Sequence, residues 1–464
     1  MAHRIEKDAL GELPVPSDAY HGVQTERAVQ NFPISGTRLP GALNVALLQI
    51  KLAAARVNQS LGVLDKRLAR AIADACEMVL VGELGDPFVV DAFQAGAGTS
   101  QHMNVNEVLA NLANELLGGK RGEYKPVHPN DHVNLGQSTN DVVPAAVRMA
   151  ALADAGPLDT ALGALVDALR ERAKAFDGIV KSGRTHLADA APIRLGQEVG
   201  AWANALAGHR SRLARACEEL SVLGIGGSAV GTGLNCPPGY RAGMVKELSR
   251  ITGRSFRGAD DYFEAMQSAA PLVELSGVLR GLALELIRIC NDVRLLASGP
   301  LTGLGELLMP AVQPGSSIMP GKVNPVMAEM LTMVCFDVVG RDTTVALAAQ
   351  AGQLELNVMM PVIAYALLPA EKHLAQGIAA FTERGVRGLE ADVERCAHYA
   401  QQSPQLVTAL APRLGYARAA ELAKQAVAQR RTVKSLAVEQ GLLTAQEAER
   451  LLDPKPLTEP EVRE

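Results

Sequence analysis

The sequence predicts an all-α protein of three domains, organised around a central bundle of five long helices. Aromatic residues make up only 3% of the 464 residues. Ala, Leu, Glu, Gln and Arg dominate the long segments instead, and these residues favour helices over sheets. In 272–296, aliphatic residues alternate at spacings of three and four, the period of one helix face. Four further Ala- and Leu-rich stretches occupy about 145–176, 196–223, 326–350 and 355–390.

These five helices are expected to form the bundle at 141–395, with a small helical domain on either side. Residues 1–140 combine shorter helices, at 41–59 and 65–82, with polar, asparagine-rich loops. Residues 396–464 are expected to form short helices because prolines repeatedly interrupt this stretch.

The helix at 272–296 is expected to be buried among several neighbours. Its apolar positions form one continuous seam, which begins at Leu272 and ends at Leu296. Leu284, Ile287 and Leu295 lie off that seam, so the helix is apolar on more than one side. A helix of this kind usually packs inside a bundle rather than against one partner.

Composition excludes several classes of function. The net charge is −5, and no Lys/Arg cluster is interleaved with aromatics, so nucleic-acid binding is not expected. The six cysteines are far apart without a CxxC pair, and the nine histidines show no HExxH spacing. We therefore expect no zinc site, disulfide framework, metal or cofactor. No stretch reaches the ~18 apolar residues of a membrane span. Without a signal-peptide core at the N-terminus, we expect a cytoplasmic protein with no membrane partner.

Three segments resemble known nucleotide-binding or catalytic motifs, but each lacks a required part of the motif. The segment from Gly315 to Lys322 has five residues between its glycines, where a P-loop has four. The glycine pattern that starts at Gly224 lacks the strand and the helix that a dinucleotide fingerprint needs. The segment 136–140 lacks the second glycine of a nucleophile elbow.

The most informative segment is 313–325, Gln-Pro-Gly-Ser-Ser-Ile-Met-Pro-Gly-Lys-Val-Asn-Pro. Its glycines and prolines exclude a regular helix or strand, so a mobile loop is expected. The loop carries two hydroxyls, a cation and an amide, a combination that suits a small, oxygen-rich anion. A plain polar connection between helices is the alternative.

Three other polar segments, 96–104, 128–141 and 182–186, interrupt helical territory, each expected at the end of a long helix. Taken singly, each segment could supply helix caps, because Ser, Thr, Asn and Asp are favoured there. Free N–H groups at helix N-termini also suit carboxylates. Together with the 313–325 loop, they favour an anion site.

At this point a family resemblance becomes specific. The run Gly315-Ser-Ser-Ile-Met-Pro-Gly-Lys-Val-Asn-Pro325 resembles the signature loop of the aspartase/fumarase superfamily. Four more segments are similar to that superfamily: Gln137-Ser-Thr-Asn-Asp141, Gly183-Arg-Thr-His186, Gly231-Thr-Gly-Leu-Asn235 and Gly352-Gln-Leu-Glu-Leu-Asn357. The resemblance covers essentially the whole chain. It implies a homotetramer whose long helices form one shared core, with each active site built from three subunits.

The resemblance also implies a chemistry, the elimination of a group from a succinyl skeleton to release fumarate. Removing a proton beside a carboxylate creates a doubly negative aci-carboxylate, which hydrogen-bond donors must stabilise. Four hydroxyl groups would surround it: Thr99, Ser138, Thr139 and Ser317. Lys322 and Asn324 would hold the other carboxylate. Ser316 would be the catalytic base, an oxyanion activated by loop N–H groups and Lys322.

Other residues receive roles from the same resemblance. Asn140, Thr185 and the catalytic His186 would contact the leaving group. A capping or core role is the alternative for His186. Ser100 joins the substrate-binding set as part of the Gly98-Thr-Ser100 motif. A second anion site would comprise His128, Asn130 and Asp131, for which a helix-cap role is equally open.

Two reactions are compatible with these motifs. Segments such as 137–140 and 353–355 are more similar to aspartate ammonia-lyases, so we expect elimination of ammonia from aspartate, with fumarate hydratase as the alternative. His102 replaces an asparagine usual in both groups, and Met360 stands where many aspartases have Glu. Either difference is compatible with another substituted succinate. A crystallin-like structural role would require loss of Ser316 or Lys322, and both are present.

Overall fold

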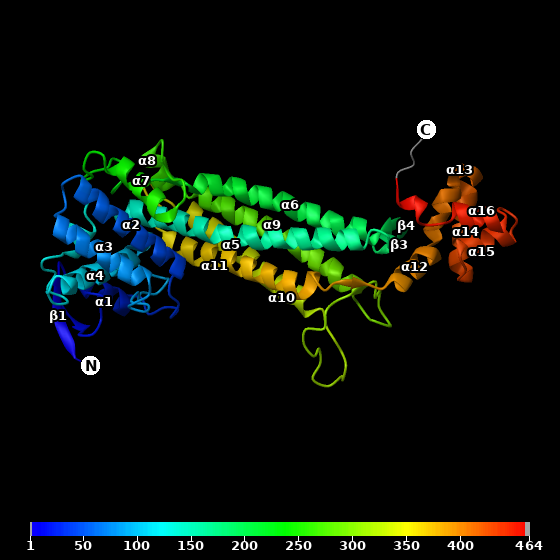
Figure 1. The fold of residues 1–464 in the computed structure, drawn as a ribbon, viewed down its shortest axis with the longest axis horizontal. Helices are drawn as coiled ribbons and strands as arrows, with labels where there is room; N and C mark the ends of the chain where they lie inside the picture. Colours follow the sequence, from blue (N-terminus) through cyan, green and yellow to red (C-terminus); the bar gives the residue numbers. More distant parts are fainter. Residues whose placement is uncertain (1, 460–464) are drawn as a thin grey trace. The chain divides into compact units, whose positions relative to one another are not determined.

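A computed structural model describes residues 2–459 of the chain and confirms the predicted all-α architecture (Figure 1). The chain divides into two compact units, which are described separately below. The first unit comprises Met1–Asp159, Ser211–Ala283 and Phe336–Leu374. The second unit comprises Thr160–Arg210, Leu284–Cys335 and Ala375–Glu464. The predicted division into three domains stays a prediction.

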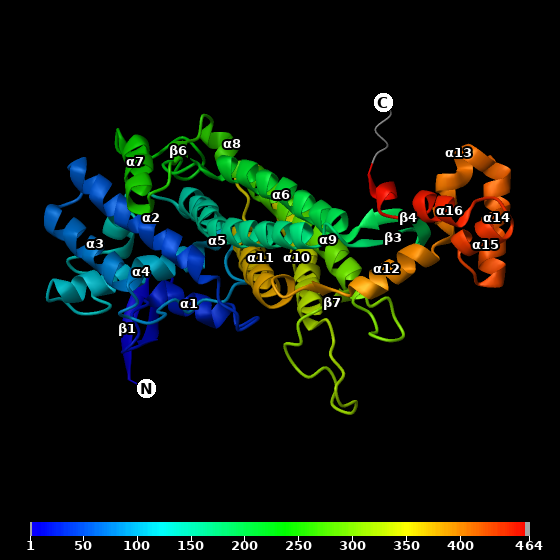
Figure 2. The same cartoon turned by 45° about the vertical axis from the view of Figure 1, so that its right-hand side comes forward.

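The five predicted long helices are present. They are α5 (Thr139–Ala175), α6 (Leu195–Leu220), α9 (Ala270–Leu296), α10 (Val326–Gln350) and α11 (Met360–Phe381). Each contributes residues to both units, and within each unit their segments lie side by side (Figures 1 and 2). The last prediction, 355–390, was too long at both ends. Helix α11 begins at Met360, before a proline in its first turn, and a π-helical turn follows it at Thr382–Val386.

Helix α9 has the buried seam that its spacing predicts. All eight seam residues are at most 5% exposed: Leu272, Leu275, Leu279, Leu282, Leu286, Ile289, Val293 and Leu296. Off the seam, Leu284 is 52% exposed and Leu295 is 40% exposed. The chain by itself therefore buries one face of α9 and leaves part of its remaining apolar surface open.

The first unit also contains six shorter helices within residues 2–459. They are α1 (Val23–Asn31), α2 (Gly41–Ser60), α3 (Lys66–Leu80), α4 (Thr99–Leu116), α7 (Tyr240–Thr252) and α8 (Tyr262–Gln267). The predictions at 41–59 and 65–82 correspond to α2 and α3. Helix α3 begins where the side chain of Asp65 accepts hydrogen bonds from the N–H groups of Arg67 and Leu68.

In the second unit, the C-terminal stretch forms short helices, as its prolines predict. They are α12 (Val393–Gln402), α13 (Ala411–Leu414), α14 (Tyr416–Gln429), α15 (Val433–Glu439) and α16 (Ala445–Leu451). A local apolar core, which includes Leu410, Leu422 and Leu436, holds several of them together. Helix α16 starts with a capping box between Thr444 and Glu447.

Small β elements add to the helices, and the sequence analysis did not anticipate them. Three pairs in the described residues 2–459 are antiparallel: β1 (His3–Asp8) with β2 (Gly11–Pro16), β3 (Val180–Thr185) with β4 (Ala188–Arg194), and β7 (Leu307–Leu308) with β8 (Glu390–Ala391). One pair is parallel: β5 (Val222–Leu223) with β6 (Arg257–Gly258). The expectation that 182–186 lies at a helix end was wrong, because these residues form most of β3 and its turn.

Helix α5 is the one helix within residues 2–459 whose length and composition would allow it to cross a membrane. Within the structure, 56% of its most apolar window is buried. Core helices of soluble proteins pass the same test. Its packing against other helices identifies α5 as a core helix.

Candidate active site

The first predicted site segment forms the start of α4. A 3₁₀ turn at Gly96–Gly98 precedes the helix, and Gly98 adopts a φ of 86°. This left-handed conformation favours glycine, and a Cβ atom at position 98 would also crowd the Val143 side chain at 3.1 Å. Thr99 is the first helical residue and its side chain is exposed, whereas Ser100 is buried. Of these two hydroxyls, Thr99 is therefore the one accessible to a substrate.

The second segment forms the start of α5 and is organised as a helix cap. The hydroxyl of Ser138 accepts a hydrogen bond from the N–H of Asn140 at 3.2 Å. In return, Asp141 Oδ1 accepts the N–H of Ser138 at 2.9 Å. This reciprocal arrangement satisfies donors at the helix start, like a capping box. It leaves Ser138, Thr139 and Asn140 half-buried at a helix N-terminus, where the dipole favours an anion.

Asp141 also ties this helix start to the glycine-rich loop that follows β5. Its Oδ2 atom accepts the N–H groups of Gly226 at 2.8 Å and Ser228 at 3.1 Å. Asn140 Nδ2 donates to the carbonyl oxygen of Ala229 at 2.8 Å. Burial raises the pKa of Asp141 to about 6, although the N–H donors oppose this shift. The loop therefore serves as a support for the α5 terminus. A strand, β5, does precede this loop, contrary to our expectation, but α7 begins only at Tyr240.

Behind Thr139 lies a buried network that the sequence analysis missed. His102 Nδ1 is 2.8 Å from Thr139 Oγ1, and His102 Nε2 is 2.5 Å from Lys51 Nζ. Lys51 is fully buried on α2, and its ammonium also donates to Asn134 Oδ1 at 3.0 Å and Gln137 Oε1 at 2.9 Å. Burial lowers the pKa of Lys51 to about 7. The hydroxyl of Thr139, a predicted substrate-binding group, is thus linked through the His102 imidazole to the buried amine of Lys51.

In the second unit, His186 occupies the tip of the β3–β4 hairpin. Thr185 pairs with Ala188, so His186 and Leu187 form a two-residue turn. Both adopt left-handed conformations, with φ of 55° and 60°, as such turns require. Thr185 and His186 are exposed. A turn of this kind presents the imidazole outward on a short, hydrogen-bonded support.

The loop at 313–325 folds back on itself before α10. Gly315 donates its N–H to the carbonyl oxygen of Lys322 at 2.8 Å, and Asn324 Nδ2 donates to the carbonyl oxygen of Gly315 at 2.7 Å. A side chain at position 315 would lie 2.6 Å from that Lys322 oxygen, so only glycine allows this closure. Ser317 and Lys322 are exposed at its surface. The loop therefore has a defined base and an open polar tip.

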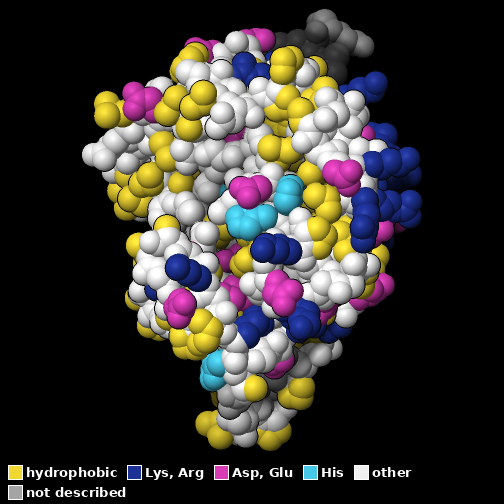
Figure 3. Space-filling view, turned by 90° about the vertical axis from the view of Figure 1, so that its left-hand side faces the viewer, with side chains coloured by type: hydrophobic (Ala, Val, Ile, Leu, Met, Phe, Trp, Pro, Cys, Tyr) yellow, Lys and Arg dark blue, Asp and Glu magenta, His cyan; other side chains and the backbone are white. Residues whose placement is uncertain are grey.

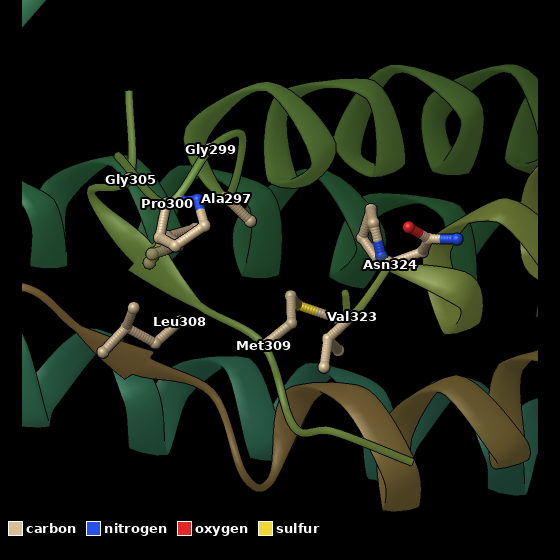
Figure 4. A pocket seen from close by; sticks show the side chains of 10 residues that line it. Ala297, Gly299, Pro300, Gly305, Leu308, Met309, Val323 and Asn324 are labelled. Atoms are coloured by element: carbon tan, nitrogen blue, oxygen red, sulfur yellow. The ribbon is translucent and has the colours of Figure 1, made fainter. Parts of the chain in front are cut away.

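Ser316 lies in this loop with two donors directed at its hydroxyl oxygen. The N–H of Met319 is 2.9 Å from Ser316 Oγ, and the N–H of Ile318 is 3.2 Å away. Two backbone donors on one oxygen are the arrangement that stabilises negative charge on it. At the base of the loop lies a pocket of about 190 Å³ (Figure 4). It is lined by Val323, Asn324 and Pro325 together with seven residues between Ala297 and Met309.

The proposed second anion site has the geometry of a helix cap. His128 Nδ1 accepts the N–H groups of Asn130 and Asp131, both at 3.3 Å, at the start of a π-helical turn at Pro129–Val133. His128 also lies 3.3 Å from Asp131 Oδ2. The cap role is therefore fulfilled, and an anion role for these residues stays a prediction. Histidine side chains gather beside acidic and basic ones on the face shown in Figure 3.

The predicted residues thus fall into two groups. Thr99, Ser138, Thr139 and Asn140 belong to the first unit, whereas Thr185, His186, Ser316, Ser317, Lys322 and Asn324 belong to the second. Sequence reasoning missed Lys51 and gave Asp141 no role. The available signal was a single lysine among apolar residues in the 41–59 helix.

Comparison with known proteins places this arrangement in context. The chain matches a family model described as lyase over residues 11–340, and one described as fumarase C C-terminus over residues 406–459. It is 48% identical over 460 residues to a class II fumarate hydratase of Bradyrhizobium diazoefficiens, covering 99% of this chain and 97% of the relative. It is 42% identical over 458 residues to an aspartate ammonia-lyase of Bacillus subtilis, covering 99% and 96%. A recombinant class II fumarase from Schistosoma mansoni superposes with a TM-score of 0.96 at 36% identity, covering 99% of this chain and 100% of that one.

Proposed function

Because the chain belongs to the aspartase/fumarase superfamily of lyases, we propose that it catalyses the reversible addition of water to fumarate, giving malate. The comparisons favour this reaction over the aspartate deamination that we expected from the motifs. The class II fumarase relative is 48% identical, whereas the aspartate ammonia-lyase relative is 42% identical. Both reactions form or consume fumarate by elimination from a succinyl skeleton.

The observation that supports this chemistry most directly is the environment of Ser316. Its hydroxyl oxygen accepts two backbone N–H groups, from Ile318 and Met319. These donors lower the cost of forming an alkoxide, which can then take the proton from the carbon beside a carboxylate. The same loop carries Lys322, whose positive charge further favours an anion there. In this proposal Ser316 is the base.

In the proposed composite site, both groups of predicted residues supply hydrogen-bond donors to the two carboxylates of the substrate. Thr99, Ser138, Thr139 and Ser317 surround the carboxylate that becomes the aci-carboxylate, and Lys322 with Asn324 holds the other. His186, Thr185 and Asn140 contact the leaving hydroxyl group, which departs as water once protonated. The glycine-hinged loop closes over the substrate and excludes bulk water. Ser100 is buried, so we assign it to supporting Thr99.

A homotetramer with composite active sites is part of this proposal. Helix α10 carries large apolar side chains on one exposed face, where Met333, Phe336 and Leu347 are 64%, 60% and 62% exposed. Together with Leu284 and Leu295 on α9, they form apolar surface of the kind that subunit contacts bury. Such contacts would bring long helices of several subunits into one core. We further propose a cytoplasmic location.

One assay tests the proposed reaction. Fumarate has a characteristic ultraviolet absorbance, so its appearance can be followed with L-malate and, separately, with L-aspartate plus analysis of released ammonia. Fumarate from malate alone supports the proposal. Fumarate from aspartate alone overturns it in favour of the aspartase reaction. Silence with both substrates overturns both reactions.

The aspartase reaction remains the second candidate because specific residues favour it. The segments Gln137-Ser-Thr-Asn140 and Gln353-Leu-Glu355 are more similar to aspartate ammonia-lyases than to fumarases. Met360, however, stands where many aspartases have Glu, and it is buried at the start of α11. A buried methionine at this position provides no carboxylate for an ammonium group.

A further inference from the structure

The buried network behind Thr139 connects three titratable or hydroxyl groups from three helices. Lys51 comes from α2, His102 from α4 and Thr139 from the first turn of α5. Lys51 Nζ to His102 Nε2 is 2.5 Å, and His102 Nδ1 to Thr139 Oγ1 is 2.8 Å. The imidazole is therefore the only link between the amine and the hydroxyl in this chain of contacts.

The amide partners of Lys51 determine where its hydrogens go. Gln137 Nε2 donates to the carbonyl oxygen of Val133 at 3.0 Å, which turns Gln137 Oε1 toward Lys51. Asn134 Nδ2 donates to the carbonyl oxygen of Gln137 at 3.3 Å, which turns Asn134 Oδ1 toward Lys51 as well. Both amides are thus acceptors for the amine. The third N–H of a protonated Lys51 points to His102.

This arrangement selects one tautomer of His102 when Lys51 is protonated. An ammonium has three donors and no acceptor, so His102 Nε2 must present its lone pair. The imidazole hydrogen then resides on Nδ1, which donates to Thr139 Oγ1. Because the oxygen of Thr139 already accepts this bond, its own hydrogen is free to point outward. The hydroxyl is then a donor for a carboxylate.

We propose that His102 is a positioning residue that couples carboxylate binding at Thr139 to the proton held by Lys51. The inference rests on the dicarboxylate site of the proposed function. It concerns a position at which the superfamily usually has asparagine.

Loss of one proton reverses every bond in the relay. A neutral Lys51 keeps two N–H bonds to the amide oxygens and turns its lone pair toward His102. His102 Nε2 then holds the hydrogen that was on Lys51, and Thr139 Oγ1 donates its hydrogen to His102 Nδ1. The hydrogen formerly on Nδ1 has passed to the threonine oxygen, whose outward proton has left to solvent. Thr139 now presents lone pairs outward, which repel a carboxylate.

The electrostatic surroundings place this change near neutral pH. Burial lowers the pKa of Lys51 to about 7, against the opposing effect of the Asp141 carboxylate. Burial and the nearby Lys51 charge keep the pKa of His102 well below its usual range, so the imidazole is neutral. The groups that face Lys51 are thus His102 from α4, Asp141 from α5 and Cys76 from α3. Burial raises the pKa of the Cys76 thiol, which therefore stays protonated.

These protonation states predict how the affinity for a carboxylate ligand changes with pH. A bound carboxylate favours the donating form of Thr139, and therefore the protonated Lys51, so binding raises the pKa of Lys51. Below about pH 7 the amine is already charged and affinity is constant with respect to this group. Above that pH, binding takes up a proton, and affinity falls by up to about tenfold per pH unit. Asparagine at position 102 cannot exchange tautomers and would abolish this dependence.

Calorimetric binding of succinate tests the proposal without turnover. Succinate has two carboxylates and no leaving group, and titrations in buffers of different ionisation enthalpy give the number of protons exchanged. At pH 8 the intact protein is expected to take up close to one proton per succinate, and His102→Asn close to none. Because His186 is present in both proteins, the difference isolates position 102. Thr139→Ser keeps the hydroxyl and should keep the uptake, whereas Thr139→Val should lose it.

Each outcome decides the matter. The relay is supported if the intact protein and Thr139→Ser take up a proton on binding succinate, whereas Thr139→Val and His102→Asn do not. If His102→Asn does not fold, the two Thr139 variants carry the test. Equal uptake in all proteins, or none in the intact protein, overturns it. A protein that takes up the proton with succinate but converts neither malate nor aspartate would disprove the proposed reaction and leave this inference standing.

Discussion

Arg184 and Glu306 form a two-contact ion pair in the second unit. Arg184 Nη1 lies 2.8 Å from Glu306 Oε2, and Arg184 Nη2 lies 3.1 Å from Glu306 Oε1. Glu306 is completely buried, and Lys181 Nζ lies 3.5 Å from its Oε2 atom. The carboxylate therefore holds β3 at two points, just before the turn that presents His186.

Replacing Glu306 with glutamine is expected to lower the free energy of unfolding by about 3 kcal/mol, because it leaves Arg184 and the buried Lys181 without their shared counter-charge. Urea unfolding followed by circular dichroism measures this. The matched control is Glu198→Gln. Glu198 Oε2 lies 3.0 Å from Lys181 Nζ, so this variant also removes a carboxylate from Lys181, but the Glu198 side chain is more exposed than that of Glu306. The control should cost less than half as much. A Glu306→Gln variant as stable as the control would contradict the anchoring role.

Ser316→Ala is expected to reduce turnover at least ~10²-fold while changing KM little, because it removes the proposed base and leaves the carboxylate donors in place. Steady-state kinetics with the substrate identified by the fumarate assay provide both constants. Ser298→Ala is the control, since Ser298 is a half-buried loop serine outside the 313–325 loop. Its hydroxyl donates to the carbonyl oxygen of Leu295 and accepts the N–H of Leu304. Near-normal turnover in Ser316→Ala would mean that another group takes the proton.

Glu371 should make the protein less stable as the pH rises. It is completely buried, and neither carboxyl oxygen has a hydrogen-bond partner within residues 2–459. Burial, and then the nearby Asp154, raise the pKa of Glu371 well above its ordinary 4.5. The folded protein thus keeps a proton that the unfolded chain releases. The contribution of Glu371 to the free energy of unfolding is fully present below pH 4.5. It is lost as the pH rises from there through the pKa of Glu371 in the folded protein, at about 1.4 kcal/mol per pH unit.

Glu371→Gln preserves the shape of the protonated acid and should remove this slope. Guanidinium unfolding at pH 5 and pH 8 should show a variant that gains stability over the original protein only at the higher pH. The control is Glu383→Gln, at an exposed position, which should change neither value. A parallel loss of stability in Glu371→Gln and the original protein would show that another group is responsible.

Phe336→Glu should dissociate the proposed tetramer and abolish activity at the same time. It places a charge on the exposed apolar face of α10, where burial against another subunit would be costly. Light scattering after size-exclusion chromatography gives the mass, and the fumarate assay gives the activity. Val427→Glu on α14 is the control, at an exposed apolar position away from the long helices. A monomeric but active Phe336→Glu variant would rule out composite active sites.

The helices were predictable because their signals are local and periodic. The prediction at 272–296 agrees with α9 within two residues, because leucine spacing along one segment determines which face is buried. The β3–β4 hairpin was not predictable in the same way. Its first strand, Val-Lys-Ser-Gly-Arg-Thr, lacks alternating apolar residues, and its charges are neutralised by distant residues such as Glu306.

The site shows the same division between local and distant information. Ser316 was identifiable because its loop is continuous in sequence, and the structure adds the two N–H donors. The relay was not, because Lys51, His102 and Thr139 are separated by 51 and 37 residues. His102 was recognised as unusual, yet its meaning depends on Lys51, and no local pattern shows that these two residues are in contact.

All five long helices contribute to both compact units, so the boundaries between the units fall inside helices rather than in linkers. Asp159 and Thr160, for example, are consecutive residues of α5. A protease that attacks exposed loops would therefore not release either unit intact. Excising one unit as a gene fragment would break five helices in mid-course. Exchanging either unit with that of another protein would likewise require joining all five helices at their interior.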